Sequence, residues 1–105
     1  MIKKIELLVS STKANEDVNL TFNIMDAKTD EGINNLEQYL GAVGHVVILS
    51  EDAEQYLHVH PTEEKATGPK AEFMTSFPHS GIYKIWGQFQ HDGKVFTVPF
   101  VVDVK

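Results

Sequence analysis

The sequence from Gly44 to Pro61, GHVVILSEDAEQYLHVHP, constrains the fold more than any other stretch of the chain. Two runs rich in Val, Ile, Leu and Tyr flank an acidic connector, residues 51–54, which is too short and too polar to form a helix. This pattern predicts a β-hairpin with a four-residue loop. Such a loop fixes the register of the two strands and places Ser50 opposite Gln55.

Three of the five histidines lie in this hairpin. The register that starts at the loop places His45 opposite His60, and His58 shares a face with His60 because side chains alternate along a strand. Directly opposite residues lie roughly 4.5–5.5 Å apart at Cβ, a separation that two nitrogen ligands of one metal ion can span. The hairpin therefore predicts three imidazoles that converge at one end of a sheet.

The size and charge of the chain limit the classes of function. Its 105 residues are enough for one hydrophobic core, so we expect a single domain over residues 1–105. The 9 basic residues are scattered among 15 acidic ones, so a nucleic-acid partner is not expected. The chain has no cysteine, which rules out disulfides, thiolate metal sites and a blue-copper centre. No apolar run approaches the roughly 20 residues that a membrane-spanning helix needs.

Seven segments have the length, apolar pattern and flanking turn residues of β-strands. They are residues 2–9, 18–25, 44–49, 55–60, 70–77, 82–90 and 94–104. The dipeptide Asp92-Gly93 predicts a tight turn between the last two, and Pro99 indicates an edge position or a bulge. We therefore expect a seven-stranded antiparallel immunoglobulin-like β-sandwich. Its core aromatics are predicted to be Phe73, Phe77, Tyr83, Trp86, Phe89, Phe96 and Phe100.

Residues 26–43 have no clear strand pattern and are expected to form a long ordered loop. Residues 34–40 could make about two helical turns at most. Leu36, Tyr39 and Leu40 are predicted to close one end of the core. Long loops in compact domains are often functional.

The predicted up-and-down order of the strands places the remaining histidines. His91 falls at the same end as His45 and His60, whereas His79 falls at the opposite end. The candidate metal ligands are therefore His45, His58, His60 and His91. Copper is the expected metal and zinc the second choice, because imidazole suits both.

A further ligand would decide between these metals. A thioether such as Met25 or Met74 would favour Cu(I), whereas a carboxylate such as Asp26 or Asp92 would favour zinc or Cu(II). The sequence leaves this ligand open. Trp86, on the predicted strand 82–90, is the one residue whose fluorescence could report on a nearby site.

Three segments together resemble a family of small bacterial domains. They are Y-L-G-A-V-G-H over residues 39–45, L-H-V-H-P over 57–61, and F-P-x-x-G-x-Y-x-x-W-x-Q-F over 77–89. They look like the extracytoplasmic, heavy-metal-linked domains of YtkA-like and CopC-like architecture. The resemblance implies metal binding through His45, His58 and His60, a location outside the cytoplasm, and a copper-transport or membrane protein as partner. The chain shows no signal peptide, which suggests an internal domain or a shortened chain.

We therefore expect a metal-binding domain that carries or senses an ion and catalyses no reaction, because no nucleophile paired with a base is apparent. One alternative is a metal-free protein interaction module, with Tyr39, Leu40 and Tyr56 at the interface. Another is a cupin-like metalloenzyme, in which His58 and His60 with Glu64 would supply two histidines and one carboxylate. A cupin would also need a glycine near Asp52 and a second histidine motif, which the chain lacks.

Overall fold

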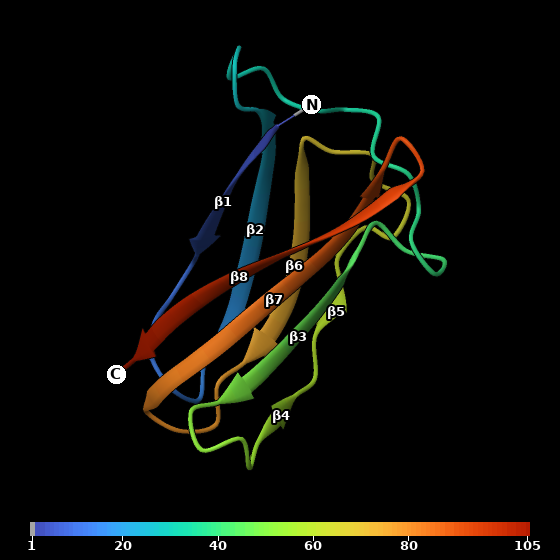
Figure 1. The fold of residues 1–105 in the computed structure, drawn as a ribbon. Helices are drawn as coiled ribbons and strands as arrows, with labels where there is room; N and C mark the ends of the chain where they lie inside the picture. Colours follow the sequence, from blue (N-terminus) through green and yellow to red (C-terminus); the bar gives the residue numbers. More distant parts are fainter. Residues whose placement is uncertain (1) are drawn as a thin grey trace.

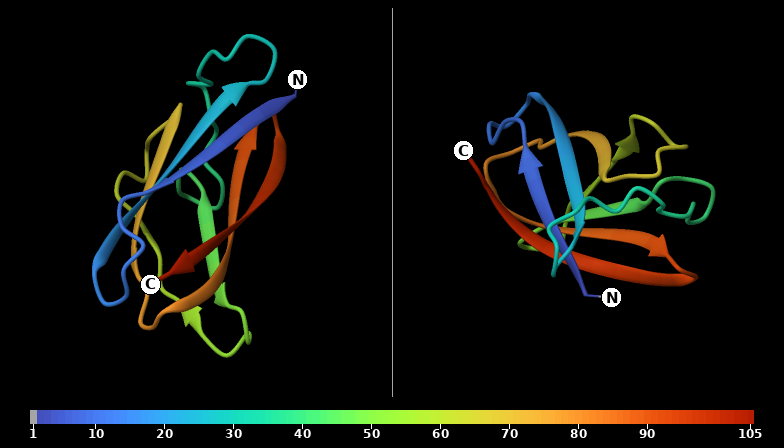
Figure 2. Two further views of the ribbon diagram at one scale, coloured as in Figure 1. Left: turned by 90° about the vertical axis from the view of Figure 1, so that its left-hand side faces the viewer. Right: turned by 90° about the horizontal axis from the view of Figure 1, so that it is seen from above.

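The computed structural model describes residues 2–105 as two four-stranded antiparallel sheets packed face to face (Figure 1). The first sheet has the order β1-β2-β6-β5. Its strands are β1 (Lys3–Val9), β2 (Asp17–Asp26), β6 (Lys70–Ser76) and β5 (His60–Pro61). The second sheet has the order β4-β3-β7-β8. Its strands are β4 (Tyr56–Leu57), β3 (His45–Ser50), β7 (Gly81–His91) and β8 (Lys94–Val104). Figure 2 shows the two sheets as separate layers. The predicted all-β antiparallel sandwich is thus confirmed.

Residues 2–105 form eight strands where the sequence predicted seven, because the predicted strand 55–60 is divided between the two sheets. Its first part follows the predicted register: the Ser50 amide donates to the Gln55 carbonyl at 3.0 Å, and Ile48 pairs with Leu57. After Leu57 the chain crosses to the other sheet, where His60 pairs with Met74 of β6. The prediction that His45 faces His60 is therefore wrong. The alternation of side chains continues through the crossing, so the pattern alone does not show which sheet an edge strand joins.

The last hairpin forms as predicted. His91 pairs with Lys94, and the two residues between them have positive φ angles, 52° at Asp92 and 74° at Gly93. This is the conformation that an Asp-Gly turn between twisted antiparallel strands adopts. Strand β8 lies at the edge of its sheet, so no further strand requires a hydrogen bond from the amide that Pro99 lacks.

The core lies between the two sheets and is built mainly from phenylalanine. Phe22, Phe73, Phe77 and Phe89 are fully buried, and the Phe22 ring lies edge-on against the rings of three other phenylalanines. The alternation along β7 directs Tyr83, Ile85 and Phe89 inward. The neighbouring Trp86 therefore faces outward, which corrects its predicted place in the core.

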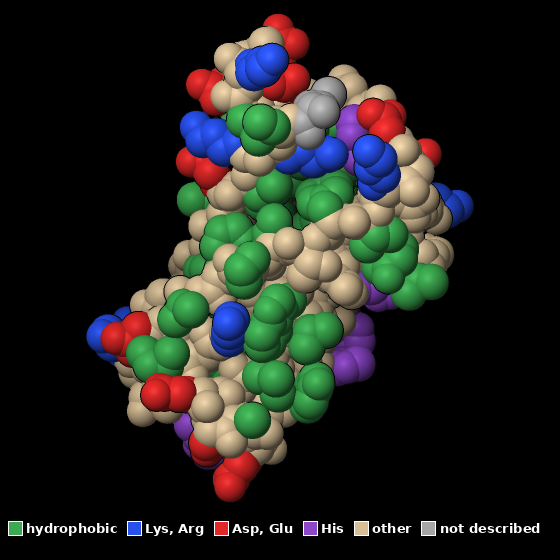
Figure 3. Space-filling view, in the orientation of Figure 1, with side chains coloured by type: hydrophobic (Ala, Val, Ile, Leu, Met, Phe, Trp, Pro, Cys, Tyr) green, Lys and Arg blue, Asp and Glu red, His purple; other side chains and the backbone are tan. Residues whose placement is uncertain are grey.

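The outward face of Trp86 carries a cation contact. The Lys84 ammonium lies 5.2 Å from the centre of the Trp86 ring. Figure 3 shows that this face of the β4-β3-β7-β8 sheet carries apolar side chains over its lower half. Phe96 and Phe100 were also predicted for the core. They are partly buried and pack against the core cluster.

The long loop between β2 and β3 contains no helical turn. Single bridges join it to the sheets instead, from Gly32 to Met25 and from Glu37 to Gln90. Leu36 is buried as predicted, whereas Leu40 is 77% exposed and does not close the core. Within residues 2–105 no helix is long and apolar enough to cross a membrane.

Candidate functional site

Two histidines and a methionine line one hollow on the outer face of the β1-β2-β6-β5 sheet, beside the crossing from β4 to β5. The hollow has a volume of about 330 Å³. It is lined by Asp17, His58, His60, Met74, Thr75 and Ser76. Figure 3 shows histidine side chains at the surface on the side where Figure 1 places β4 and β5. We refer to this feature as the His58–His60 hollow.

The two imidazoles of the hollow are in contact. The ring centres of His58 and His60 lie 4.0 Å apart, with their planes nearly perpendicular at 88°. Both side chains are exposed, whereas Val59 between them packs against the core. The Thr75 hydroxyl donates to the His58 carbonyl at 2.9 Å and fixes the main chain at the crossing. The backbone that carries the two histidines is therefore fixed at the crossing, while both rings are exposed at the surface.

Met74 is the third donor of the hollow. It is the direct cross-strand partner of His60, and opposite residues of an antiparallel pair share a face. Its side chain is 40% exposed. The sequence named Met74 as one possible ligand, and the pairing of β5 with β6 brings it beside the histidines.

Asp17 supplies a carboxylate to the same hollow. If the β5–β6 register is extended by two residues, His58 lies opposite Ser76, and Ser76 pairs with Asp17 of β2. The Met74 thioether thus lies directly across from His60, and the Asp17 carboxylate lies across Ser76 from His58. Sequence reasoning missed Asp17, because only the order β2-β6-β5 brings it near the histidines.

His45 lies apart from this hollow. It begins β3 and pairs with Gln88, and its Nε2 donates to the Tyr39 carbonyl at 2.9 Å. The Tyr39 and His45 rings meet edge to face with their centres 5.5 Å apart. His45 therefore joins the long loop to the start of β3.

His91 joins the same loop to the end of β7. Its side chain is only 3% exposed, and its Nε2 lies 2.9 Å from Asn35 Oδ1, which makes Nε2 the donor. The other nitrogen, Nδ1, has no hydrogen-bond partner and lies 3.5 Å from the Asp92 carboxylate. The Glu37 carboxylate accepts the Gly93 amide nearby at 2.7 Å. His91 thus serves as an anchor for the loop.

Replacing Asn35 by alanine is expected to lower the free energy of unfolding by about 1–3 kcal/mol, because the buried Nε2–H of His91 then loses its acceptor. Amide exchange in the loop should quicken at the same time. Urea denaturation and hydrogen exchange measure the two effects. Asn34→Ala, at the exposed neighbouring position, is the control and should change neither quantity. Equal stability of the two variants would contradict this role of His91.

The other ligands suggested by the sequence do not reach the His58–His60 hollow. Met25 is buried near the end of β2 that is far from Asp17, with its sulfur 3.6 Å from the Asn23 amide nitrogen. The Asp26 carboxylate accepts the Lys28 amide at 2.8 Å. Across residues 2–105, no three His, Asp, Glu or Cys side chains gather in a way that could hold a metal ion. The predicted set of His45, His58, His60 and His91 is thus not brought together.

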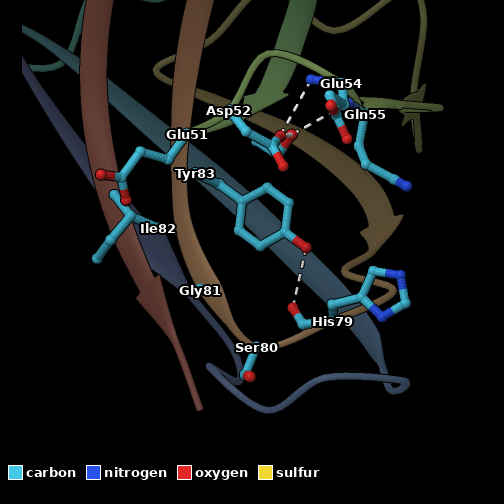
Figure 4. A pocket seen from close by; sticks show the side chains of 10 residues that line it. Glu51, Asp52, Glu54, Gln55, His79, Ser80, Gly81, Ile82 and Tyr83 are labelled. Atoms are coloured by element: carbon cyan, nitrogen blue, oxygen red, sulfur yellow. Dashed lines mark hydrogen bonds between the residues drawn. The ribbon is translucent and has the colours of Figure 1, made fainter.

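A hollow of about 680 Å³ lies around the turns that follow β3 and precede β7, where His79 lies at the end away from His91, as predicted (Figure 4). The Asp52 side chain in this hollow is hydrogen-bonded within its own turn. The Asp52 carboxylate accepts the Ser50 hydroxyl at 2.5 Å and the Glu54 amide at 3.0 Å. The Ser50 hydrogen bond, followed by the Glu54 amide, holds the pKa of Asp52 below its usual value. Tyr83 donates to the His79 carbonyl at 2.9 Å, so these residues fix the chain around the turns.

Comparison with known proteins places the chain in a family. A family model described as a domain of unknown function, DUF8832, matches residues 3–105. The chain belongs to the DUF8832 family. No curated protein matches this DUF8832 chain. The resemblance to YtkA-like and CopC-like domains stays a prediction.

A search of solved structures gives the fold. The DUF8832 chain is similar to the Lin-41 filamin domain, with a TM-score of 0.58, 15% sequence identity, and coverage of 98% of this chain and 91% of that one. At this identity the likeness shows the fold alone. It confirms that the sandwich is immunoglobulin-like.

Proposed function

We propose that this domain binds one copper(I) ion in the His58–His60 hollow and catalyses no reaction. The observation that carries this proposal is the pairing of His60 with Met74, beside a His58 ring whose centre is 4.0 Å from that of His60. Two imidazoles and one thioether then line one hollow. The ligand set predicted from the sequence is thereby reduced to His58 and His60, with Met74 as the added ligand.

The chemistry of these donors favours copper. A thioether is a soft ligand that selects Cu(I), and imidazole binds copper and zinc alike. Zinc remains the second choice, because the two imidazoles suit it as well. Binding requires the two rings to rotate so that one nitrogen of each faces the ion. Their exposure and the backbone anchor at Thr75 allow this rotation without movement of the strands.

The position of the hollow suits transfer of the ion. It lies at the exposed edge of a sheet, where a partner can approach and exchange ligands with the bound metal. A copper-transport or membrane protein outside the cytoplasm is the partner that the sequence resemblance implies.

The arrangement of side chains offers no support for the enzyme alternatives. Within residues 2–105 no serine or threonine hydroxyl is hydrogen-bonded to a histidine ring. Glu64, the carboxylate of the cupin-like alternative, lines a different hollow, next to His45.

The test is a long-range proton–nitrogen NMR titration of the five imidazoles with Cu(I) and, separately, with Zn(II). Both ions are diamagnetic, so ligand nitrogens stay visible. We expect the resonances of His58 and His60 to shift together and to saturate at one equivalent of Cu(I). The resonances of His45, His79 and His91 should stay in place.

Two variants make this titration specific. Replacing both His58 and His60 by alanine should lower Cu(I) affinity by at least about 100-fold, a loss of roughly 2.7 kcal/mol. His79→Ala, which removes an exposed histidine that lines a different hollow, should leave the affinity unchanged. Uncoordinated drift of all five histidines, or equal affinity of the double variant and the wild type, would refute the metal proposal.

A second candidate function, peptide binding, is favoured by the open edge of β3. Strand β4 ends at Leu57, and within residues 2–105 no strand pairs with β3 before Ile48 on that side. Backbone alternation from the Ser50–Gln55 hydrogen bond directs the amide and carbonyl of Val46 to this edge. A groove of about 310 Å³ adjoins it, lined in part by Leu40, Val59, Pro61 and Phe73. An extended peptide could add a strand here and place an apolar side chain in the groove.

This candidate is tested with a displayed library of random linear peptides. Peptides that bind through the groove should lose at least about tenfold in affinity to Leu40→Asp, which places a charge on the groove wall. Leu8→Asp, at an exposed leucine on strand β1, is the control. Chelators should not affect this binding. Equal loss in both variants, or no enrichment of peptides, would exclude the groove.

A further inference from the structure

The thioether of Met74 is the donor of the His58–His60 hollow that an oxidant can convert into a polar group. Met74 is 40% exposed, whereas Met25 is 8% exposed and packed near the end of β2. Oxidants attack methionine sulfur according to its exposure. Of these two methionines, the one beside the histidines is therefore the accessible one.

We propose that Met74 is a modification site: its oxidation to the sulfoxide removes the preference of the hollow for Cu(I). This inference rests on the proposed function of the same site. It adds a form of regulation, in which hydrogen peroxide acts on a ligand while the two imidazoles stay unchanged.

The oxidation itself is a two-electron step. A lone pair of Met74 sulfur attacks one oxygen of hydrogen peroxide, and the O–O bond breaks as the S–O bond forms. Proton transfer to the departing hydroxide releases water. Sulfur is oxidised to the sulfoxide and peroxide is reduced, so no further reactant is required.

The product differs from the thioether in the property that selects the metal. The sulfoxide presents a polar, hard oxygen where the thioether presented a soft sulfur, and Cu(I) prefers the soft donor. Asp17 already provides a hard carboxylate in the neighbouring row, next to Ser76. After oxidation the hollow keeps its two imidazoles but has no soft donor, so Cu(I) loses more affinity than Zn(II) does.

The exposure of the other donors supports this assignment. His58, His60 and Asp17 are exposed at the rim of the hollow, so a change at Met74 does not disturb a packed core. The side chain of Met74 lies on the outer face of β6, where Phe73 and Thr75 on either side point inward. The oxidised side chain can therefore be accommodated with the fold intact.

The experiment treats the metal-free protein with hydrogen peroxide and follows Met74 and Met25 separately by peptide mass spectrometry. Met74 should be oxidised first, and Ag(I), a redox-inert substitute for Cu(I), should slow its oxidation. Cu(I) and Zn(II) affinities are then measured by competition with chromogenic chelators. Oxidation should weaken Cu(I) binding by about tenfold or more, and Zn(II) affinity should change by less than about twofold.

Met74→Leu is the matched variant. It should lose Cu(I) affinity to the same degree without peroxide and should show no further loss after treatment. A methionine sulfoxide reductase should restore the affinity of the oxidised wild type but not that of Met74→Leu.

The outcomes separate this inference from the proposed function. If Met74 oxidises no faster than Met25, or if the oxidised protein binds Cu(I) as well as the untreated one, the inference is overturned while copper binding stands. If the untreated protein binds no Cu(I) through His58 and His60, the proposed function itself fails.

Discussion

Replacing Phe22 by alanine is expected to lower the free energy of unfolding by about 3–5 kcal/mol. Phe22 is fully buried, and the centres of the Phe73, Phe89 and Phe100 rings lie 5.7, 5.3 and 5.9 Å from its own. These rings come from both sheets, so the truncated side chain leaves a cavity that neither sheet can close alone. The loss is a large fraction of the roughly 5–15 kcal/mol by which small domains are stable.

Urea denaturation followed by far-ultraviolet circular dichroism measures this effect. Leu8→Ala is the control, because Leu8 is 64% exposed on the outer face of β1. It should change the stability by no more than about 0.5 kcal/mol. A cost below about 1.5 kcal/mol for Phe22→Ala would show that the core does not depend on this cluster of rings.

The second large effect is expected for Gly44→Ala, which should cost about 2–3 kcal/mol. A Cβ at position 44 would lie 2.5 Å from Phe89 Cδ1 and 2.7 Å from the Gln88 carbonyl oxygen. The ring is fully buried, and the carbonyl belongs to the strand that pairs with His45. Neither neighbour can move without disturbing the start of β3.

Gly41→Ala provides the comparison for this prediction. A Cβ there meets nothing within 4 Å, but the residue has a φ of +85°, so strain alone should cost about 1 kcal/mol. Thermal unfolding of the two variants separates the steric effect from the effect of strain. A smaller loss at Gly44 than at Gly41 would contradict the close approach of β3 to Phe89.

Local sequence patterns were enough to predict the parts of the fold that depend on neighbouring residues. The Asp92-Gly93 turn forms because both residues tolerate positive φ. The register from Ser50 to Gln55 follows from the length of the loop between the strands. Trp86 was misplaced because its size suggested the core, whereas its position in the alternation of β7 decides its face.

The site was predictable only in part, for the same reason. Alternation places His58 and His60 on one face without any knowledge of the sheet. The neighbours Met74 and Asp17 depend on which strands lie side by side, and that choice involves residues far apart in the chain. His45 and His91 instead form hydrogen bonds with Tyr39 and Asn35. Both partners lie in the long loop, whose sequence has no periodic pattern from which these contacts could be predicted.

The crossing from β4 to β5 has a mechanical consequence for the sandwich. Along this edge the two layers are joined by the covalent chain through His58 and Val59, so loss of hydrogen bonds cannot separate them there. At the opposite edge the layers are tied by hydrogen bonds from Lys105 to Thr12 and from Ala14 to Lys105. Of the two edges, the one formed by β1 and β8 is therefore the one at which breaking hydrogen bonds alone can part the layers.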